Sequence, residues 1–238
     1  MSGHSKWAQI HRQKGATDAK RGALFTKLGK AITVAAKTGG GDPDKNFKLR
    51  LTIDQAKSAN MPKDNIERAI KRGTGELAGG KIEEATYEGF GPAGVALMIE
   101  CLTDNRNRSS ASIKHILAKH DGSLGGPGSV AWMFEQKGVI KTGKINEELE
   151  LALIDLGGED IVNEEDGTTI YANPGGLKTI KEFLEKKGLK VNYAEVEQTA
   201  KEKKSLDAGQ KEQIQKLFDE LDDDEDVNDY YSNAEFGK

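Results

Sequence analysis

The sequence predicts an α+β protein of three domains: a basic helical N-terminal domain precedes two α/β domains, and the third, ferredoxin-like domain is inserted into the second. Apolar residues recur in steps of three and four over the first 75 residues, which is typical of amphipathic helices. From Lys81 onward, short apolar runs of strand type alternate with helical patterns. One stretch of this second part has the element order β-α-β-β-α-β of ferredoxin-like domains. The expected domains are 1–78, 79–136 together with 205–238, and 137–204.

The helical domain is expected to hold an arm and three helices, because its periodic stretches are separated by helix-breaking residues. Thr17 is the expected N-cap of the first helix, which Gly39-Gly40-Gly41 ends. Asp42-Pro43 is expected to start the second helix, since Asp suits the N-cap and Pro the first helical position. Gly73 is expected to end the third. The segments are an arm over 1–16 and helices over 18–38, 43–60 and 62–72.

The elements of the other two domains follow from short apolar runs bounded by turn residues. Residues 201–206 are polar and rich in lysine, and they are expected to link the inserted domain back to the second domain. The last helix and strand then return to the second domain. Strands are expected over 85–90, 94–102, 130–140, 138–142, 159–163, 168–172, 189–196 and 227–233, and helices over 105–120, 146–156, 174–187 and 207–221.

Positive charge is concentrated in the first domain, although the whole chain has a net charge of −4. Residues 1–75 hold 16 Lys and Arg against 6 Asp and Glu, a difference of +10. The remaining residues hold 19 basic against 33 acidic side chains, a difference of −14. A polyanion such as nucleic acid is therefore expected to contact the first domain.

Basic residues surround Trp7 in the arm and continue along the first helix. Lysines and arginines neutralise phosphates and release counterions, while an aromatic ring can stack on an exposed base. An amphipathic helix with Trp7 packed in the core explains the composition equally well. The expected nucleic-acid-binding residues are His4, Lys6, Trp7, His11, Arg12, Lys14, Lys20, Arg21, Lys27 and Lys30.

A second basic feature lies at a strand-to-helix junction, in Thr103–Ser110. A helix N-terminus flanked by Arg106 and Arg108 can hold an anion or phosphate. The alternative, which the residue types favour modestly, is a capping segment with Asp104 or Thr103 as the N-cap.

An acidic run at Asp219–Asp226 holds seven acids in eight positions. It resembles the start of an EF-hand, but Val227 stands where the calcium loop requires glycine. A solvated negative loop is the simplest interpretation. The alternative is a mimic of nucleic acid that competes in cis for the basic arm.

Sequence motifs that would indicate an enzyme are absent or lie in the wrong structural context. Gly89–Gly94 matches G-x-G-x-x-G by letter, but Pro92 and a following strand make it a hairpin turn. The four histidines show no metal-ligand spacing, and Cys101 lies in an apolar strand as a packed core thiol. We therefore expect a protein that is not an enzyme, with no catalytic residue, metal or cofactor.

The single cysteine suits a reducing compartment, and no apolar run approaches the roughly 20 residues of a membrane helix. A cytoplasmic protein without a membrane partner is expected. The sequence leaves the oligomeric state open.

Several segments together resemble the YebC/PmpR family from the first residue nearly to the last. They are Met1–His11, Lys14–Lys20, Gly22–Leu28, Asn60–Ile70, Tyr87–Pro92, Thr103–Arg108, Gly128–Phe134 and Tyr231–Phe236. The resemblance implies a helical first domain, two α/β domains, and neither catalytic residues nor a cofactor.

The resemblance also implies two functional alternatives. Bacterial relatives are described as probable transcriptional regulators that bind DNA, and other members resemble translation factors that act on the ribosome. DNA is the first expectation for the partner and ribosomal RNA the alternative. The sequence shows no clear helix-turn-helix, because the Gly39–Gly41 connection does not lead into an obvious recognition helix.

Overall fold

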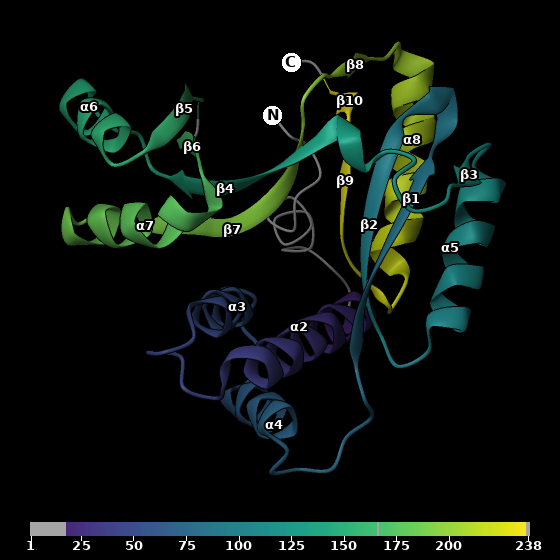
Figure 1. Ribbon diagram of the computed structural model, residues 1–238, viewed down its shortest axis with the longest axis horizontal. Helices are drawn as coiled ribbons and strands as arrows, with labels where there is room; N and C mark the ends of the chain where they lie inside the picture. Colours follow the sequence, from purple (N-terminus) through teal and green to yellow (C-terminus); the bar gives the residue numbers. More distant parts are fainter. Residues whose placement is uncertain (1–17, 166, 237–238) are drawn as a thin grey trace. The chain divides into compact units, whose positions relative to one another are not determined.

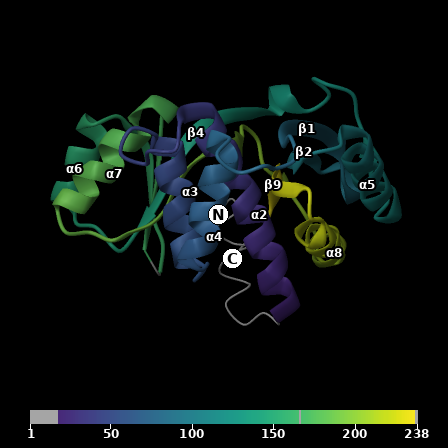
Figure 2. The ribbon, with the colours of Figure 1, turned by 90° about the horizontal axis from the view of Figure 1, so that it is seen from below.

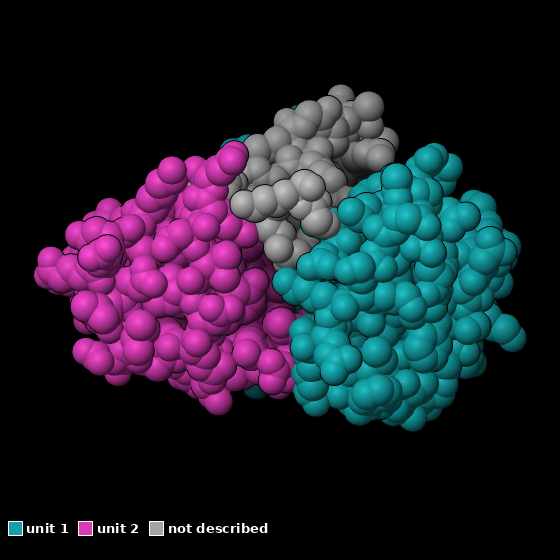
Figure 3. Space-filling view, turned by 90° about the horizontal axis from the view of Figure 1, so that it is seen from above, with its two compact units in different colours: residues 1–134, 200–238 teal, residues 135–199 magenta. Residues whose placement is uncertain are grey.

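The computed structural model describes residues 18–165 and 167–236, so the arm over 1–16 and Thr17 lie outside the described residues. The chain forms two compact units (Figure 3). Unit 1 holds residues 1–134 and 200–238, and unit 2 holds residues 135–199.

Unit 1 begins with three helices, α2 (Asp18–Gly39), α3 (Phe47–Ser58) and α4 (Lys63–Thr74). Both α3 and α4 pack against α2 (Figures 1 and 2). The apolar stripe expected for the first helix faces this core. Its buried residues include Leu28 and Ile32 of α2, Leu49 and Ile53 of α3, and Ile66 and Ala69 of α4.

The predicted start of the second helix at Asp42-Pro43 is wrong, because α3 begins at Phe47 with Asn46 as its N-cap. The Asn46 side chain accepts a hydrogen bond from the Leu49 amide at 3.1 Å. Its amide group also donates to the carbonyl oxygens of Ala35 and Gly40, each at 2.8 Å. One buried side chain therefore caps α3 and satisfies carbonyls at the end of α2.

The predicted end of the third helix at Gly73 is also wrong, since α4 continues to Thr74 and Gly75 is its left-handed C-cap. Gly73 is required for a different reason. A Cβ atom added there would lie 2.4 Å from the Thr33 carbonyl oxygen and 2.7 Å from the Ala36 Cβ. The glycine allows α2 and α4 to approach each other closely.

Replacing Gly73 with alanine is expected to destabilise the protein by about 1–3 kcal/mol, the usual cost of overpacking a tight contact. Gly29→Ala is the matched control, because its new Cβ would have Met61 Cε as nearest neighbour at 3.8 Å. That control should be neutral or stabilising, as alanine is the better helix former. Chemical denaturation of both variants measures the difference, and equal effects would contradict the close-approach argument.

A four-stranded antiparallel sheet with the order β3-β1-β2-β9 forms the second part of unit 1. Its strands are β1 (Glu83–Phe90), β2 (Ala96–Thr103), β3 (Ser123–Leu124) and β9 (Val227–Ser232). Because β9 pairs with β2, the last segment of the chain returns to this sheet as the sequence predicts. Gly89–Gly94 lies at the β1–β2 connection, with a short 3₁₀ helix η2 (Pro92–Gly94), and does not open a long helix.

The side chains of β2 alternate between two cores. Leu97, Ile99 and Cys101 pack with α5 (Arg106–Lys119) and α8 (Ala208–Asp223), which lie beside the sheet in Figure 1. On the other face, Ala96 and Met98 pack in a second cluster with Val130, Phe134 and Tyr231. The alternation is that of a strand buried on both faces.

Unit 2 is built on a sheet with the strand order β5-β6-β4-β7. This order and the chain order β-α-β-β-α-β are those of a ferredoxin-like domain, so the predicted fold class is confirmed. The elements are β4 (Phe134–Thr142), α6 (Glu147–Asp155), β5 (Gly158–Asn163), β6 (Thr168–Ala172), η4 (Pro174–Gly176), α7 (Leu177–Lys186) and β7 (Val191–Ala200).

The strand expected to begin at Val130 begins only at Phe134. Residues Ala131–Met133 form a 3₁₀ helix, η3. The remaining short strands, β8 (Lys204–Ser205) and β10 (Ala234–Glu235), pair in parallel near the C-terminal end of the described chain.

Candidate nucleic-acid interface

The ten residues predicted to bind nucleic acid fall into three groups. His4, Lys6, Trp7, His11, Arg12 and Lys14 lie outside the described residues, and the same is true of the side chain of Lys20 in α2. Arg21 is exposed near the start of α2. The last two, Lys27 and Lys30, face the acidic run.

Lys27 and Lys30 make contacts within the chain, and nucleic-acid binding by these two residues stays a prediction. The Lys27 ammonium is buried and donates to the Asp222 carbonyl oxygen at 2.6 Å. Burial lowers the pKa of Lys27 even though the surrounding aspartates, Asp222 foremost, act to raise it. Lys30 donates to the Glu225 carbonyl oxygen at 2.9 Å. Both ammonium groups are thus used within the chain.

Asp226 joins three elements of unit 1 through its buried carboxylate. Its Oδ1 accepts from Lys30 Nζ of α2 at 2.8 Å. Its Oδ2 accepts from Arg108 Nη2 of α5 at 2.8 Å and from Thr103 Oγ1 of β2 at 3.0 Å. Burial raises the pKa of the Asp226 carboxyl, but the Lys30 and Arg108 hydrogen bonds outweigh it and hold that pKa below its ordinary value.

The acidic run is therefore more than a solvated loop. The backbone and side chains of residues 222–226 hold cations of the first helix in cis. Competition of this run with nucleic acid for the basic arm stays a prediction. These contacts are made with α2, and the basic residues of the arm lie outside the described residues.

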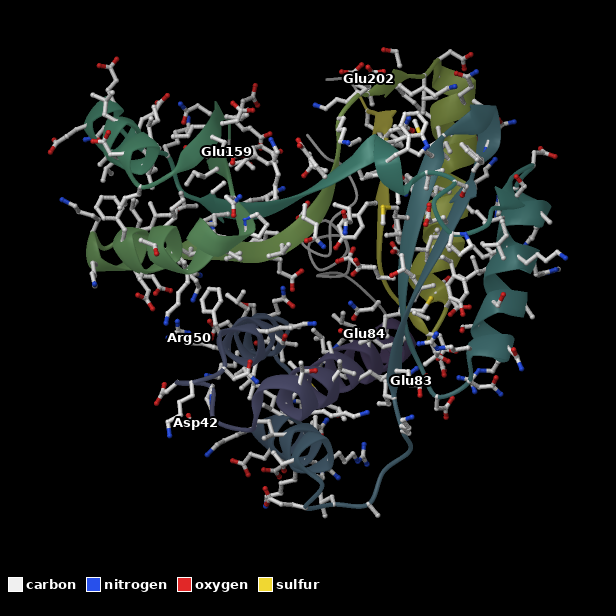
Figure 4. All side chains as sticks on the ribbon, in the orientation of Figure 1. Asp42, Arg50, Glu83, Glu84, Glu159 and Glu202 are labelled. Atoms are coloured by element: carbon white, nitrogen blue, oxygen red, sulfur yellow. The ribbon has the colours of Figure 1, made fainter. Side chains whose placement is uncertain are left out.

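Arg106 and Arg108, the possible secondary anion site, both pair with carboxylates of the chain. Arg106 pairs with Glu83 at 3.1 Å and donates to the Glu84 carbonyl oxygen (Figure 4 labels both glutamates). Arg108 pairs with Asp104 at 2.9 Å as well as with Asp226. The anions at this junction are the chain's own carboxylates.

The N-cap of this helix is Asn105, and not Thr103 or Asp104 as the sequence predicted. Its side-chain oxygen accepts from the amides of Asn107 and Arg108, each at 3.1 Å. The helix N-terminus is thereby satisfied locally.

Sequence reasoning missed a basic face on α4. Arg68, Lys71 and Arg72 are exposed on this helix, with Lys63 at its start. Arg68 reaches the Asn65 side chain and the Asp64 carbonyl oxygen, so its charge is held in place but is not paired there with a carboxylate. The signal was present in Arg68, Lys71 and Arg72, since residues three and four apart share one helix face.

Arg68 and Arg72 also border a groove of about 1210 Å³ in unit 1. Phe25 and Met61 are among the apolar residues that line it. Asp224 and Glu225 line it as well, so the groove combines guanidinium groups with carboxylates. A phosphate is attracted by the arginines and repelled by the carboxylates.

The described residues offer no sign of a metal site, a reactive cysteine or a membrane-spanning helix. Within it, His, Cys, Asp and Glu side chains form no group of three or more that could hold a metal ion. Cys101 is buried, and burial raises the pKa of its thiol to about 12, which keeps it un-ionised near neutral pH. No helix among these residues has the length and apolar character needed to cross a bilayer.

Two family models match the chain. The model described as "TACO1/YebC protein N-terminal domain" matches residues 5–76, and "TACO1/YebC second and third domain" matches residues 82–234. The fold is similar to the crystal structure of a conserved hypothetical protein, Aq1575 from Aquifex aeolicus. The two chains are 41% identical with a TM-score of 0.84, and the match covers 94% of each.

Full-length relatives carry regulatory names. A "probable transcriptional regulatory protein" of Caldanaerobacter subterraneus is 48% identical over 99% of this chain and 98% of its own length. Proteins with the same description from Syntrophus aciditrophicus and Geobacter sulfurreducens are 49% and 47% identical, each over 98% of this chain and 95% of the relative.

Proposed function

The chain belongs to the TACO1/YebC family, and we propose that it regulates gene expression by binding nucleic acid without catalysing a reaction. Within this class we propose a cytoplasmic, DNA-binding regulator of transcription. The names of the full-length relatives support the regulatory role. No membrane and no cofactor are part of the proposal.

The observation that carries the proposal is the division of the basic residues of the first domain into two sets. Lys27 and Lys30 are held by the acidic run. Arg68, Lys71 and Arg72 remain exposed on α4. With the arm, whose basic residues are Lys6, Arg12 and Lys14, they supply the cations that phosphate contacts require.

A second candidate function is that of a ribosome-associated translation factor that contacts ribosomal RNA through the arm. The exposed indole of Trp132 favours it, because loops of folded RNA present unpaired bases that stack on aromatic rings. Phosphate contacts from the arm and α4 are common to both candidates.

Two charge-reversal variants test the proposal. One replaces Lys6, Arg12 and Lys14 with Glu, and the other is Arg68→Glu with Arg72→Glu. Each is expected to weaken binding to a labelled DNA duplex at least tenfold. Each should also lower the salt slope of log K by about 0.9 for every phosphate that the variant no longer neutralises. Fluorescence anisotropy over a salt series measures both quantities.

Lys114→Glu with Lys216→Glu is the matched control for the α4 variant. Both lysines are exposed, on α5 and α8, and the double substitution changes the net charge equally. If control and test variants bind alike, only long-range charge matters and the interface is misplaced. If the arm and α4 variants both bind as wild type does, the proposal fails.

Fractionation of a cell lysate on a sucrose gradient separates the two candidates. Migration with ribosomes that survives DNase treatment would contradict a purely transcriptional role. Loss of the heavy fraction after DNase, with the protein then at the top of the gradient, would support binding to DNA.

A further inference from the structure

We propose that Trp132 is a stacking platform for an unpaired nucleobase, a contact separate from the arm and α4. The inference rests on the proposed nucleic-acid binding and adds to it a preference for single-stranded or looped segments. It is carried by the exposure of the ring, the order of the loop that presents it, and the contact of Lys201 with the backbone of that loop.

The Trp132 side chain is 68% exposed, an unusual state for the largest apolar side chain. Its flanking residues are anchored: Val130 and Phe134 are buried in one core cluster, against which Ala131 and Met133 pack. The indole N–H donates to the Ser129 carbonyl oxygen at 3.2 Å. The polar atom of the ring is therefore satisfied within the loop, and the ring itself remains open to solvent.

A carboxylate holds the loop in place. The Glu88 side chain, from β1, accepts hydrogen bonds from three backbone amides, those of Gly128 at 2.7 Å and of Val130 and Ala131 at 2.8 Å each. Burial raises the pKa of the Glu88 carboxyl, yet these amides outweigh it and keep that pKa low. A platform ordered before binding loses less conformational entropy when the ligand arrives.

Lys201 contacts the backbone of the loop that carries the ring. Lys201 Nζ donates to the Trp132 carbonyl oxygen at 2.9 Å, and its amide donates to the Met133 carbonyl oxygen at the same distance. Lys203 and Lys204 follow in the same segment, with Glu202, labelled in Figure 4, as the acid among them. An aromatic ring next to cations is the usual combination for single-stranded nucleic acid, where bases stack and lysines neutralise phosphates.

The surroundings favour a nucleobase over an apolar protein partner. A protein hot spot is a ring set in a wider apolar patch. Near Trp132 in sequence, the exposed Glu135 and Gln136 are charged or polar and Gly128 lacks a side chain, although Pro127 is also exposed. Lys201, which contacts the backbone of the loop, is charged. Leu77, the other exposed large apolar residue among the described residues of unit 1, lies in the segment after α4.

The experiment uses the full chain with Trp7→Phe, so that Trp132 is the only tryptophan. Titration with a 12-nucleotide oligouridylate and with oligothymidylate is expected to quench the indole emission in both cases. A DNA duplex and an oligothymidylate with abasic sites should quench it far less. Trp132→Ala should weaken oligouridylate binding about tenfold, as expected for the loss of one stacked base, and leave duplex binding unchanged.

Trp132→Phe should restore most of the affinity, because a smaller ring still stacks. An unchanged circular dichroism spectrum of Trp132→Ala checks that the variant is folded. Equal quenching by oligouridylate and by the abasic oligonucleotide would overturn the platform.

The platform and the proposed function fail differently. Unquenched Trp132 emission, together with weakened binding in the arm variant, would overturn the platform and leave the proposed function standing. Absence of binding to every oligonucleotide and duplex by the wild-type chain would overturn both. Blue-shifted emission before any ligand is added would show a covered ring and also reject the platform.

Discussion

Replacing Asp226 with alanine is expected to lower the free energy of unfolding by about 3 kcal/mol. This is the lower end of the usual cost of removing one partner from a buried ion pair, because the Arg108 side chain is half exposed and keeps its contact with Asp104. The carboxylate is the shared acceptor for Lys30, Arg108 and Thr103. Without it, Lys30 retains only the Glu225 carbonyl oxygen and Thr103 loses a buried acceptor. Urea denaturation followed by circular dichroism measures the change in stability.

Glu225→Ala is the matched control, since it removes the same charge one residue earlier from an exposed side chain. Its backbone carbonyl still accepts from Lys30, so a change within about 0.5 kcal/mol is expected. If both variants lose equal stability, repulsion within the acidic run and not the buried pair decides the outcome.

The contribution of Asp226 should also depend on pH. Its pKa is lower in the folded protein than the ordinary value of about 3.9 for the unfolded chain. A group with a depressed folded pKa stabilises the protein above its unfolded pKa and loses that contribution as the pH falls through the folded pKa. The difference between wild type and Asp226→Ala is therefore expected to be constant near neutral pH and to shrink below about pH 4.

The fold could be predicted because its signals are local. The apolar stripe of α2 faces the core as its spacing indicates, and the β-α-β-β-α-β order gives the sheet of unit 2. Some errors concern the choice of one capping residue among near neighbours, as at Asn46 and Asn105. Another concerns a position where a contact distant in sequence decides the structure. Glycine is typical of a helix end, but Gly73 is required because it lies against the Thr33 carbonyl oxygen of another helix.

The candidate site shows the same limit. Lys27 and Lys30 fit a basic surface by spacing, yet their partners stand 195 and 196 residues later in the chain. A local sequence pattern cannot reveal which residues form such pairs, although the negative charge of the acidic run suggested a basic partner within the chain. Arg68 and Arg72 are different, because their spacing alone places them on one face of a helix.

Glu88→Ala is expected to destabilise the protein by about 3 kcal/mol and to release the loop over 125–133. Three backbone amides lose a charged acceptor, and a hydrogen bond to a charged group contributes about 1.5–3 kcal/mol. The expected value is lower than the sum of three such hydrogen bonds, because Gly128 is exposed and water can replace the carboxylate at its amide. Val130 is buried, so water does not replace the hydrogen bond to its amide.

Hydrogen exchange of the Val130 and Ala131 amides, together with thermal unfolding, measures both effects. Glu88→Gln should show about half the destabilisation, because its carbonyl oxygen still accepts although the amide nitrogen cannot. Glu202→Ala, at an exposed glutamate, controls for the removal of one negative charge. Unchanged amide protection in Glu88→Ala would mean that the apolar packing of Val130 and Phe134 alone orders the loop, and the pre-ordered Trp132 platform would then rest on those contacts instead.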